Sequence, residues 1–476
     1  MKKDNSKKHA EKDGPAIKMA EPIAVDRRSR ADRKDEGKSL RLALPLASHA
    51  QWQAPANRRD PIELLIESSI GRVPELLPIR YGRMMQSPFT FYRGTAALMA
   101  ADLATLPTTG IRVQACGDCH LVNFGGFGTP ERRQVFAIND FDETLPAPWE
   151  WDVKRLAASF VVAGRSNSYS ADEAREAAQT CVRSYRERMR EFSKMGVLDV
   201  WYSNIDLEEA IETVEDETAR ERGKKRMAKA RDRDVMDEDF PEMVTFEGGV
   251  HRIRDNPPLI FHTQGEEAAV LEARVREAFD AYRATLPEDR RLLLDRYEYK
   301  DLAMKVVGVG SVGTRCAIML MMGGADDVLF LQVKEARASV LEPYAGQSTY
   351  TNHGQRVVMG QRLMLSSSDI FLGWTEANNG KHFYIRQLRD MKLKPLVELF
   401  TPEVMNQYAE LCGWALAGSH ARSGDAAKIA GYLGKKEDFD IAIADFSESY
   451  ADQNELDYKA LVQAVQQGRL DVYIER

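Results

Sequence analysis

The sequence predicts an α+β protein in which a small β-rich unit lies between two helical regions. Between Asp60 and Phe192 most apolar residues recur at helical spacing, and residues 171–192 have the pattern of a strong amphipathic helix. Near Asp301 the pattern changes to short strand-like runs separated by Gly-rich or Asp-rich turns. After Pro395 helical spacing returns and continues to the end of the chain. These three observations define the fold class.

The order of elements divides the chain into four parts. Residues 1–47 are rich in Lys, Arg, Asp and Glu with few aromatic residues, so we expect them to be largely disordered. Residues 48–300 form a helical lobe, residues 301–395 the β-rich lobe, and residues 396–476 further helices that return to the first lobe. The elements expected early in the chain are helices within 61–70, 73–85 and 92–106, a strand at 111–115, a loop at 113–128, a strand at 134–141 and a helix at 151–164.

The bulk properties exclude several classes of protein. A net charge of −7 disfavours a nucleic-acid binder that works by phosphate neutralisation. No apolar run is long enough to span a membrane, and the charged N-terminus has no apolar signal core. The five cysteines are sparse and odd in number, unlike a disulfide framework. We therefore expect a soluble cytoplasmic protein with neither nucleic-acid nor membrane partners.

The segment Gly117-Asp118-Cys119-His120-Leu121-Val122-Asn123 carries the clearest chemical signal. Phosphoryl transfer needs a carboxylate that orients the incoming hydroxyl and accepts its proton, and oxygen ligands that hold magnesium across the phosphates. A loop Asp followed five residues later by Asn supplies the carboxylate and one such ligand. The next strand ends at Asp140, which adds a second magnesium ligand. Asp142, two residues later, is a candidate ligand for a second ion.

A second signal lies in the β-rich unit, where residues 308–313 have the Gly-x-Gly-x-x-Gly spacing. A glycine turn lets backbone N–H groups approach phosphates, and Lys334 at the end of a strand can pair with their oxygens. The candidate nucleotide-binding residues of this unit are Gly308, Gly310, Ser311, Gly313 and Lys334. A dinucleotide fingerprint has the same spacing, but the turn at 323–327 leaves too few residues for a helix and a parallel strand. An antiparallel hairpin therefore fits better.

The Gly-Asp-x-His-x-x-Asn loop and the following Asp-Phe-Asp resemble the catalytic and metal-binding loops of aminoglycoside phosphotransferases and protein kinases. The resemblance implies ATP and Mg²⁺ as cofactors. It implies that Asp118, His120 and Asp152 belong to the catalytic machinery, with Asp152 supporting the loop, and that Asn123, Asp140 and Asp142 are metal ligands. It also implies that Gln387 and Leu388 face the adenine. Cys116 replaces the histidine that usually precedes Gly-Asp.

In familiar kinases the glycine turn and the lysine precede the catalytic loop, whereas here they follow it. The helix at 411–421 also resembles the one that normally leads into that loop. One circular permutation would explain these displacements, so we expect a two-lobed kinase-like fold with its lobes in swapped order. Lys334 should then lie within about 10 Å of Asp140. Strands through Val306, Ala317, Val333 and Tyr384 should form one sheet, and the helix around Trp414 should pack against residues 116–164.

The overall order of motifs, including Ser87-Pro88-Phe89 and Tyr92-Arg93-Gly94, resembles an uncharacterised bacterial family, domain of unknown function 2252. The resemblance covers about residues 60–460 and implies no substrate.

In kinases a glutamate pairs with the lysine that corresponds to Lys334. Glu335 and Glu342 are the candidates for that carboxylate here.

Other patterns predict less. Cys116, Cys119 and His120 match a haem-attachment motif and could suggest zinc or redox chemistry, but packing around a loop is the favoured interpretation. His420 and Asp425 lack the nucleophile elbow of a hydrolase, so a structural hydrogen bond is favoured for His420. The charged stretch 207–241 is expected to be a solvated helix or an insertion without function.

The function expected from the sequence is ATP- and magnesium-dependent phosphoryl transfer to a hydroxyl or amine acceptor. Aminoglycosides, other small alcohols or amines, and protein hydroxyls all remain open as acceptors. A nucleotide-binding regulatory pseudoenzyme and a nucleotidyl (AMP) transferase on the same fold are the alternatives.

Overall fold

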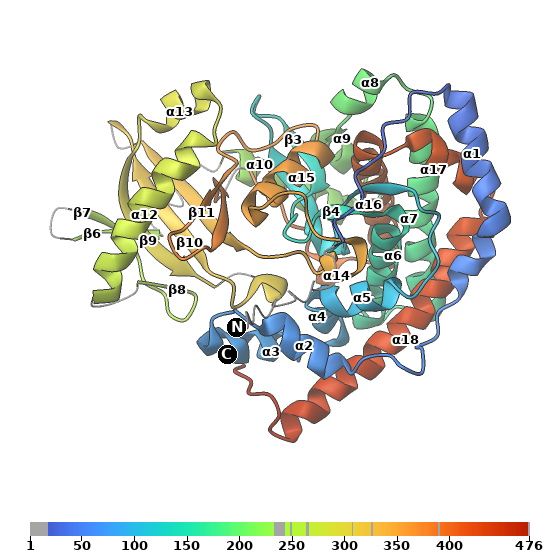
Figure 1. The fold of residues 1–476 in the computed structure, drawn as a ribbon, viewed down its shortest axis with the longest axis horizontal. Helices are drawn as coiled ribbons and strands as arrows, with labels where there is room; N and C mark the ends of the chain where they lie inside the picture. The colour runs from blue at the N-terminus through green and yellow to red at the C-terminus, as the bar shows by residue number, and fades with distance from the viewer. Residues whose placement is uncertain are drawn as a thin grey trace, which may run out of the picture.

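The computed structural model describes residues 18–232, 243–247, 250–262, 266–306, 308–324, 327–388 and 391–474. A six-stranded sheet with two covering helices lies at one end, and a helical part lies at the other (Figure 1). The predicted α+β class is confirmed. No helix within the described ranges is long and apolar enough to cross a membrane.

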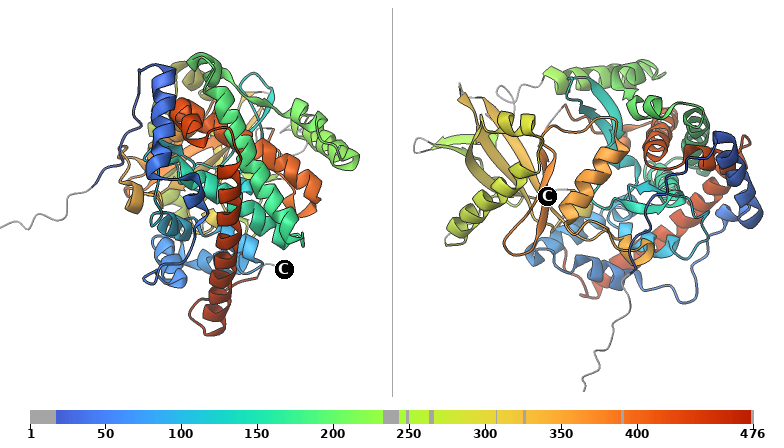
Figure 2. Two further views of the ribbon diagram at one scale, coloured as in Figure 1. Left: turned by 90° about the vertical axis from the view of Figure 1, so that its right-hand side faces the viewer. Right: turned by 45° about the horizontal axis from the view of Figure 1, so that its top comes forward.

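The helical part has α6 and α7 at its centre, with α16 and α18 packed against them (Figure 2). Helix α7 (Ala171–Phe192) has the bounds that the amphipathic pattern predicted, and Ser170 caps its first turn together with Glu173. Trp149 is fully buried and stacks on Tyr185 with ring centroids 5.7 Å apart. The other helices of this part are α1 (Arg30–Ala43), α2 (Pro61–Ser69), α3 (Leu77–Met84), α4 (Pro88–Arg93), α5 (Ala96–Leu103), α6 (Trp149–Ser166), α8 (Val197–Tyr202), α9 (Leu207–Glu212), α10 (Glu217–Asp232), α16 (Pro402–Ser423), α17 (Ala426–Leu433) and α18 (Asp438–Gln466).

Two small antiparallel sheets lie inside the helical part. Strand β1 pairs with β4, and β3 pairs with both β2 and β5. The segment 124–128, which was predicted to be loop, is strand β2, because β3 supplies its hydrogen bonds. A Cβ on Gly126 would lie 2.5 Å from the Leu207 side chain, so glycine allows the close packing here. The bounds are β1 (Arg112–Ala115), β2 (Phe124–Gly128), β3 (Gln134–Ile138), β4 (Leu145–Pro148) and β5 (Ile205–Asp206).

The larger sheet is antiparallel, with the strand order β12-β13-β11-β10-β9-β8. Ala317, Val333 and Tyr384 lie in this sheet as predicted, and Val306 follows the last residue of β9. Because β9 and β10 pair antiparallel around the glycine turn, the geometry of a dinucleotide fold is absent from this part of the described chain. The strands are β8 (Ile260–Phe261), β9 (Glu298–Lys305), β10 (Cys316–Met322), β11 (Val328–Ala336), β12 (Gly373–Glu376) and β13 (His382–Gln387), and a separate hairpin is formed by β6 (Val244–Glu247) and β7 (Val250–Ile253).

One face of this sheet is covered by α12 (Glu266–Ala284) and α13 (Glu288–Leu294), which contribute the buried side chains of Tyr282 and Leu294. Helix α14 (Glu342–Ala345) and helix α15 (His353–Met364) follow β11 and connect the sheet to the helical part. The chain then returns through α16, which packs against α7, β3, β1 and α6. The helix around Trp414 therefore contacts the region that the sequence predicted.

The prediction for the charged N-terminal segment needs correction. Residues 30–43 were expected to be disordered but form α1, which packs against α17; a Cβ on Gly37 or on Gly431 would lie 2.1 Å from a carbonyl of the opposite helix. Glycine at the crossing lets two polar helices approach closely, which composition alone does not reveal. Residues 1–17 lie outside the described residues.

The charged stretch 207–241 forms α9 and α10 up to Asp232, and its remainder lies outside the described residues. Helix α10 is more than a solvated helix, because it forms one wall of a cavity of about 620 Å³. The opposite walls are β2, β3, α16 and the segment 393–400. Leu207, Phe400 and Trp414 are among the apolar side chains that line it.

Candidate functional site

The Asp118 loop is fixed from below by Asp152, in the first turn of α6. The Asp152 carboxylate accepts hydrogen bonds from the backbone N–H groups of Cys116 at 2.6 Å and Gly117 at 2.9 Å. Its third contact is His420 Nε2 at 3.2 Å, and His420 Nδ1 lies 2.8 Å from the Tyr185 hydroxyl. The supporting role that the resemblance implied for Asp152 agrees with these contacts, as does the structural role favoured for His420.

The turn at Gly117 requires glycine. Its φ is +83°, and a Cβ there would lie 2.5 Å from the Glu143 carbonyl oxygen. Asp425, which a hydrolase would need as the partner of His420, caps α17 and forms an ion pair with Arg33.

Asp118 is held by a residue that the sequence did not single out. Arg155, one helical turn after Asp152, donates from Nε and Nη2 to Asp118 Oδ1 at 2.8 and 2.5 Å. The guanidinium also lies over the Tyr92 ring, 4.7 Å from its centroid, and Tyr92 donates to the Arg155 carbonyl. Asp118 Oδ2 takes no hydrogen bond from any described residue. It is therefore the oxygen available to accept a proton.

His120 lies beside this carboxylate, with Nε2 4.0 Å from Asp118 Oδ2. Burial, followed by repulsion from Arg93 and Arg155, lowers the pKa of His120 well below its usual value, so its ring is neutral. Within the described residues its Nδ1 has no hydrogen-bond partner. A neutral, buried imidazole adds no charge next to the carboxylate.

Asn123 directly precedes β2, and Asp140 follows the end of β3, the strand that pairs with β2. Asn123 Nδ2 donates to the Asp118 carbonyl at 2.8 Å, which orients the amide, and the Asn139 N–H bonds to the Asn123 carbonyl. Burial and the neighbouring Asp142 raise the pKa of Asp140. Among the described residues no three His, Cys, Asp or Glu side chains gather as a metal-binding group. A magnesium ion here would therefore use the Asp140 carboxylate and the Asn123 amide, with the remaining oxygens from ligand and water.

Lys334 on β11 reaches across to these acids. Its Nζ lies 2.8 Å from Asp142 Oδ2 and 3.9 Å from Asp140 Oδ1, within the separation predicted from the sequence. Burial by itself would lower the pKa of Lys334, but the two carboxylates outweigh it and raise that pKa well above its usual value. The Tyr384 hydroxyl donates to Asp142 Oδ1 at 2.6 Å.

Neither candidate glutamate pairs with Lys334. Glu335 binds Arg315 and Lys381, and Glu342 lies near His353. Lys334 pairs with Asp142 instead, the residue for which the resemblance implies a role as a metal ligand. Arg356 on α15 donates to the carbonyls of Asp142 and Thr144, which fixes the backbone of this segment.

The glycine turn lies directly against Asp118. Val309–Ser311 form a short 3-10 turn, and a Cβ on Gly310 would lie 3.7 Å from Asp118 Oδ2. Gly313, with φ of +87°, accepts a hydrogen bond from the Val73 N–H at 2.7 Å. Gly308 precedes the turn, and the side chain of Ser311 lies outside the described part.

Gln387 is the last residue of β13, and Leu388 follows it. The Gln387 N–H donates to Asp369 Oδ2 and the Leu388 N–H donates to the Phe330 carbonyl. Both backbone donors are thus already in use. Leu388 packs with Ile318 and Phe330 in an apolar cluster on one face of the six-stranded sheet.

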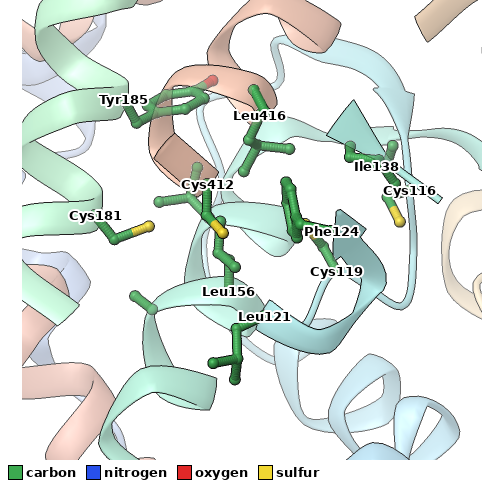
Figure 3. Packing of buried hydrophobic residues seen from close by; sticks show 14 of the residues in the cluster. Cys116, Cys119, Leu121, Phe124, Ile138, Leu156, Cys181, Tyr185, Cys412 and Leu416 are labelled. Carbon is green, nitrogen blue, oxygen red and sulfur yellow. The ribbon is translucent and has the colours of Figure 1, made fainter. Parts of the chain in front are cut away.

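The cysteines of the loop are core residues. Cys116 and Cys119 have no solvent exposure and lie among apolar side chains such as Leu121, Phe124 and Ile138 (Figure 3). Burial raises the pKa of the Cys119 thiol well above its usual value. Both cysteines are thiols packed beneath the loop.

Residues 72–464 match a protein family described as uncharacterized protein conserved in bacteria (DUF2252), and the chain belongs to that family. The matched range contains the Asp118 loop, Asp140, the glycine turn and Lys334. No curated protein and no solved structure matches the chain.

Proposed function

We propose that this protein is an ATP- and magnesium-dependent phosphotransferase with a circularly permuted kinase-like fold. The observation that carries the proposal is the convergence of two distant segments. Lys334 lies 2.8 and 3.9 Å from the acids at 142 and 140, and a Cβ on Gly310 would lie 3.7 Å from Asp118 Oδ2, although about 190 residues separate the two segments. A carboxylate loop, a cation and a glycine turn are the parts that phosphoryl transfer needs.

The residues around Asp118 and Lys334 have separate roles in this proposal. Asp118 Oδ2 would accept the proton of the acceptor, while Arg155 holds the carboxylate in position from the other oxygen. Asn123 and Asp140 would hold magnesium, which supplies positive charge to the phosphate oxygens. When nucleotide binds, Lys334 would release Asp142 and pair with phosphate oxygens. The Asp142 carboxylate and the phosphate chain are both anions, and they compete for the one ammonium group of Lys334.

Turnover in a metabolite extract tests the proposal. Purified protein would be incubated with Mg-ATP and the extract, and products would be sought by mass spectrometry. Gain of a phosphoryl group on an acceptor, absent with Asp118→Asn, is the expected result. Gain of AMP would select nucleotidyl transfer instead. Mg-ATP binding without any product in repeated extracts would select the regulatory pseudoenzyme.

A further inference from the structure

The six-stranded sheet presents three cations on one face. Ala303, Gln332 and Arg386 lie on the row of β-sheet partners that passes through Ile318. Lys305 is two residues after Ala303 on β9, and Lys334 is two residues after Gln332 on β11. Because side chains alternate along a strand, Lys305, Lys334 and Arg386 all project from the same face.

Two more lysines approach from the segment after β13. Leu393 exchanges both backbone hydrogen bonds with Gly126 at 2.9 Å, which places this segment beside β2, the strand that follows Asn123. The Leu393 side chain packs against the main core. Lys392 and Lys394 flank it, and alternation directs them to the other side of the extended segment.

These lysines are close enough to repel each other. Burial and then Lys394 lower the pKa of Lys305, while burial and then Arg386 lower the pKa of Lys392. For Lys394, burial and repulsion from Arg93 and Arg386 lower the pKa in spite of Asp140 nearby. The three lysines therefore lie near one another, with Lys394 also near Asp140 and Lys392 near Lys334 and Arg386.

The positive charge of these three lysines is not balanced. Arg155 pairs with Asp118, and Lys334 pairs with Asp142 and Asp140. The ammonium groups of Lys305, Lys392 and Lys394 make no ion pair or hydrogen bond with any described residue. Neighbouring like charges without partners repel each other, and a polyanion would relieve that repulsion.

We propose that Lys305, Lys392 and Lys394 form a second basic wall, distinct from Lys334, that binds the phosphate chain of a nucleoside triphosphate. The identity of the nucleotide rests on the proposed function, whereas the phosphate site rests on the sheet register and the unpaired charges. The wall also disfavours a polycationic acceptor such as an aminoglycoside, because such a molecule would meet repulsion next to Asp118.

Calorimetric titration of the full chain tests the wall. The probes are Mg-ATP, AMP, adenosine and inorganic tripolyphosphate, and the variants are Lys305→Gln and Lys392→Gln. Lys300→Gln is the matched control, because Lys300 lies on the same strand and pairs with Glu298 at 2.6 Å. Each wall variant should weaken ATP and tripolyphosphate about tenfold, as expected for one charge-assisted contact, and leave adenosine unchanged.

A second measurement excludes misfolding as the cause. Removing a repelled, buried charge should leave the melting temperature of the ligand-free variants equal to or above that of the wild type. Wild-type affinity for tripolyphosphate in both wall variants would overturn the inference. Lysine-dependent binding of tripolyphosphate without any ATP binding or turnover would sustain the wall and overturn the proposed function alone. If the wild type binds neither Mg-ATP nor tripolyphosphate, both the basic wall and the proposed function are overturned.

Discussion

Asp152 and Asp140 lie on either side of the same loop, but their surroundings differ. Asp152 is almost completely buried and accepts two backbone hydrogen bonds in addition to its contact with His420. The Asp140 side chain is 33% exposed; it accepts one backbone hydrogen bond, from Asp142, and its nearest cation is 3.9 Å away. Burial and Asp142 raise its pKa. A satisfied carboxylate anchors the backbone, whereas an unsatisfied one can bind an added cation.

The largest effect should come from breaking the anchor. Asp152→Ala leaves the N–H groups of Cys116 and Gly117 buried without an acceptor, so we expect a loss of about 3–5 kcal/mol in the free energy of unfolding. Urea unfolding followed by circular dichroism measures it. Asp172→Ala, in the first turn of α7, is the control. A change below about 1 kcal/mol would show that Asp152 does not anchor the loop.

Turnover should respond most to Asp118. Asp118→Asn keeps the shape of the side chain but removes the base, so turnover should fall about 100-fold or more while Mg-ATP binding stays nearly intact. Rates on the acceptor found in the extract provide the measurement. Equal turnover in the variant would remove Asp118 from the mechanism.

Asp140→Asn should separate binding from stability. Loss of the carboxylate should weaken magnesium-dependent ATP binding about tenfold or more, because an amide is a poorer magnesium ligand. The free energy of unfolding should change by less than about 1 kcal/mol, since the removed charge is repelled by Asp142. Titration of ATP with and without Mg²⁺, with Asp452→Asn as an exposed control, checks both parts. Retained binding would contradict the metal assignment.

The last prediction concerns Glu143, the next acid along the chain, and it appears only as a dependence of stability on pH. Burial raises its pKa to about 7, and its Oε2 accepts the Val340 N–H. Since the folded-state pKa lies above the unfolded one, the folded protein binds more protons between pH 4.5 and 7, and stability falls as pH rises through this window. Glu143→Gln should remove that fall, which a shift from 4.5 to about 7 sets at about 3 kcal/mol, in unfolding experiments at several pH values. An identical pH slope in the variant would contradict the shift.

Part of this site was predictable from local sequence. The spacing of Asp118 and Asn123, the strand that ends before Asp140 and the hairpin around the glycine turn all follow from short-range patterns. The Asp152 anchor was found by resemblance. The pairing of Arg155 with Asp118 was not predicted, although Arg155 lies in the helix expected at 151–164 and Tyr92 in the Tyr92-Arg93-Gly94 motif, because an arginine on a buried helix carries no sign of its partner.

The sequence by itself determined the α+β class, the bounds of α7 and the family, because periodicity, capping and motif order are properties of neighbouring residues. Only the tertiary structure decided that α1 folds onto α17, that Asp142 rather than a glutamate pairs with Lys334, and that the turn at Gly310 lies near Asp118. It also brought Lys305, Lys392 and Lys394 near one another. Such contacts join residues far apart in the chain, and the charges and close approaches that select them exist only once both segments are in place.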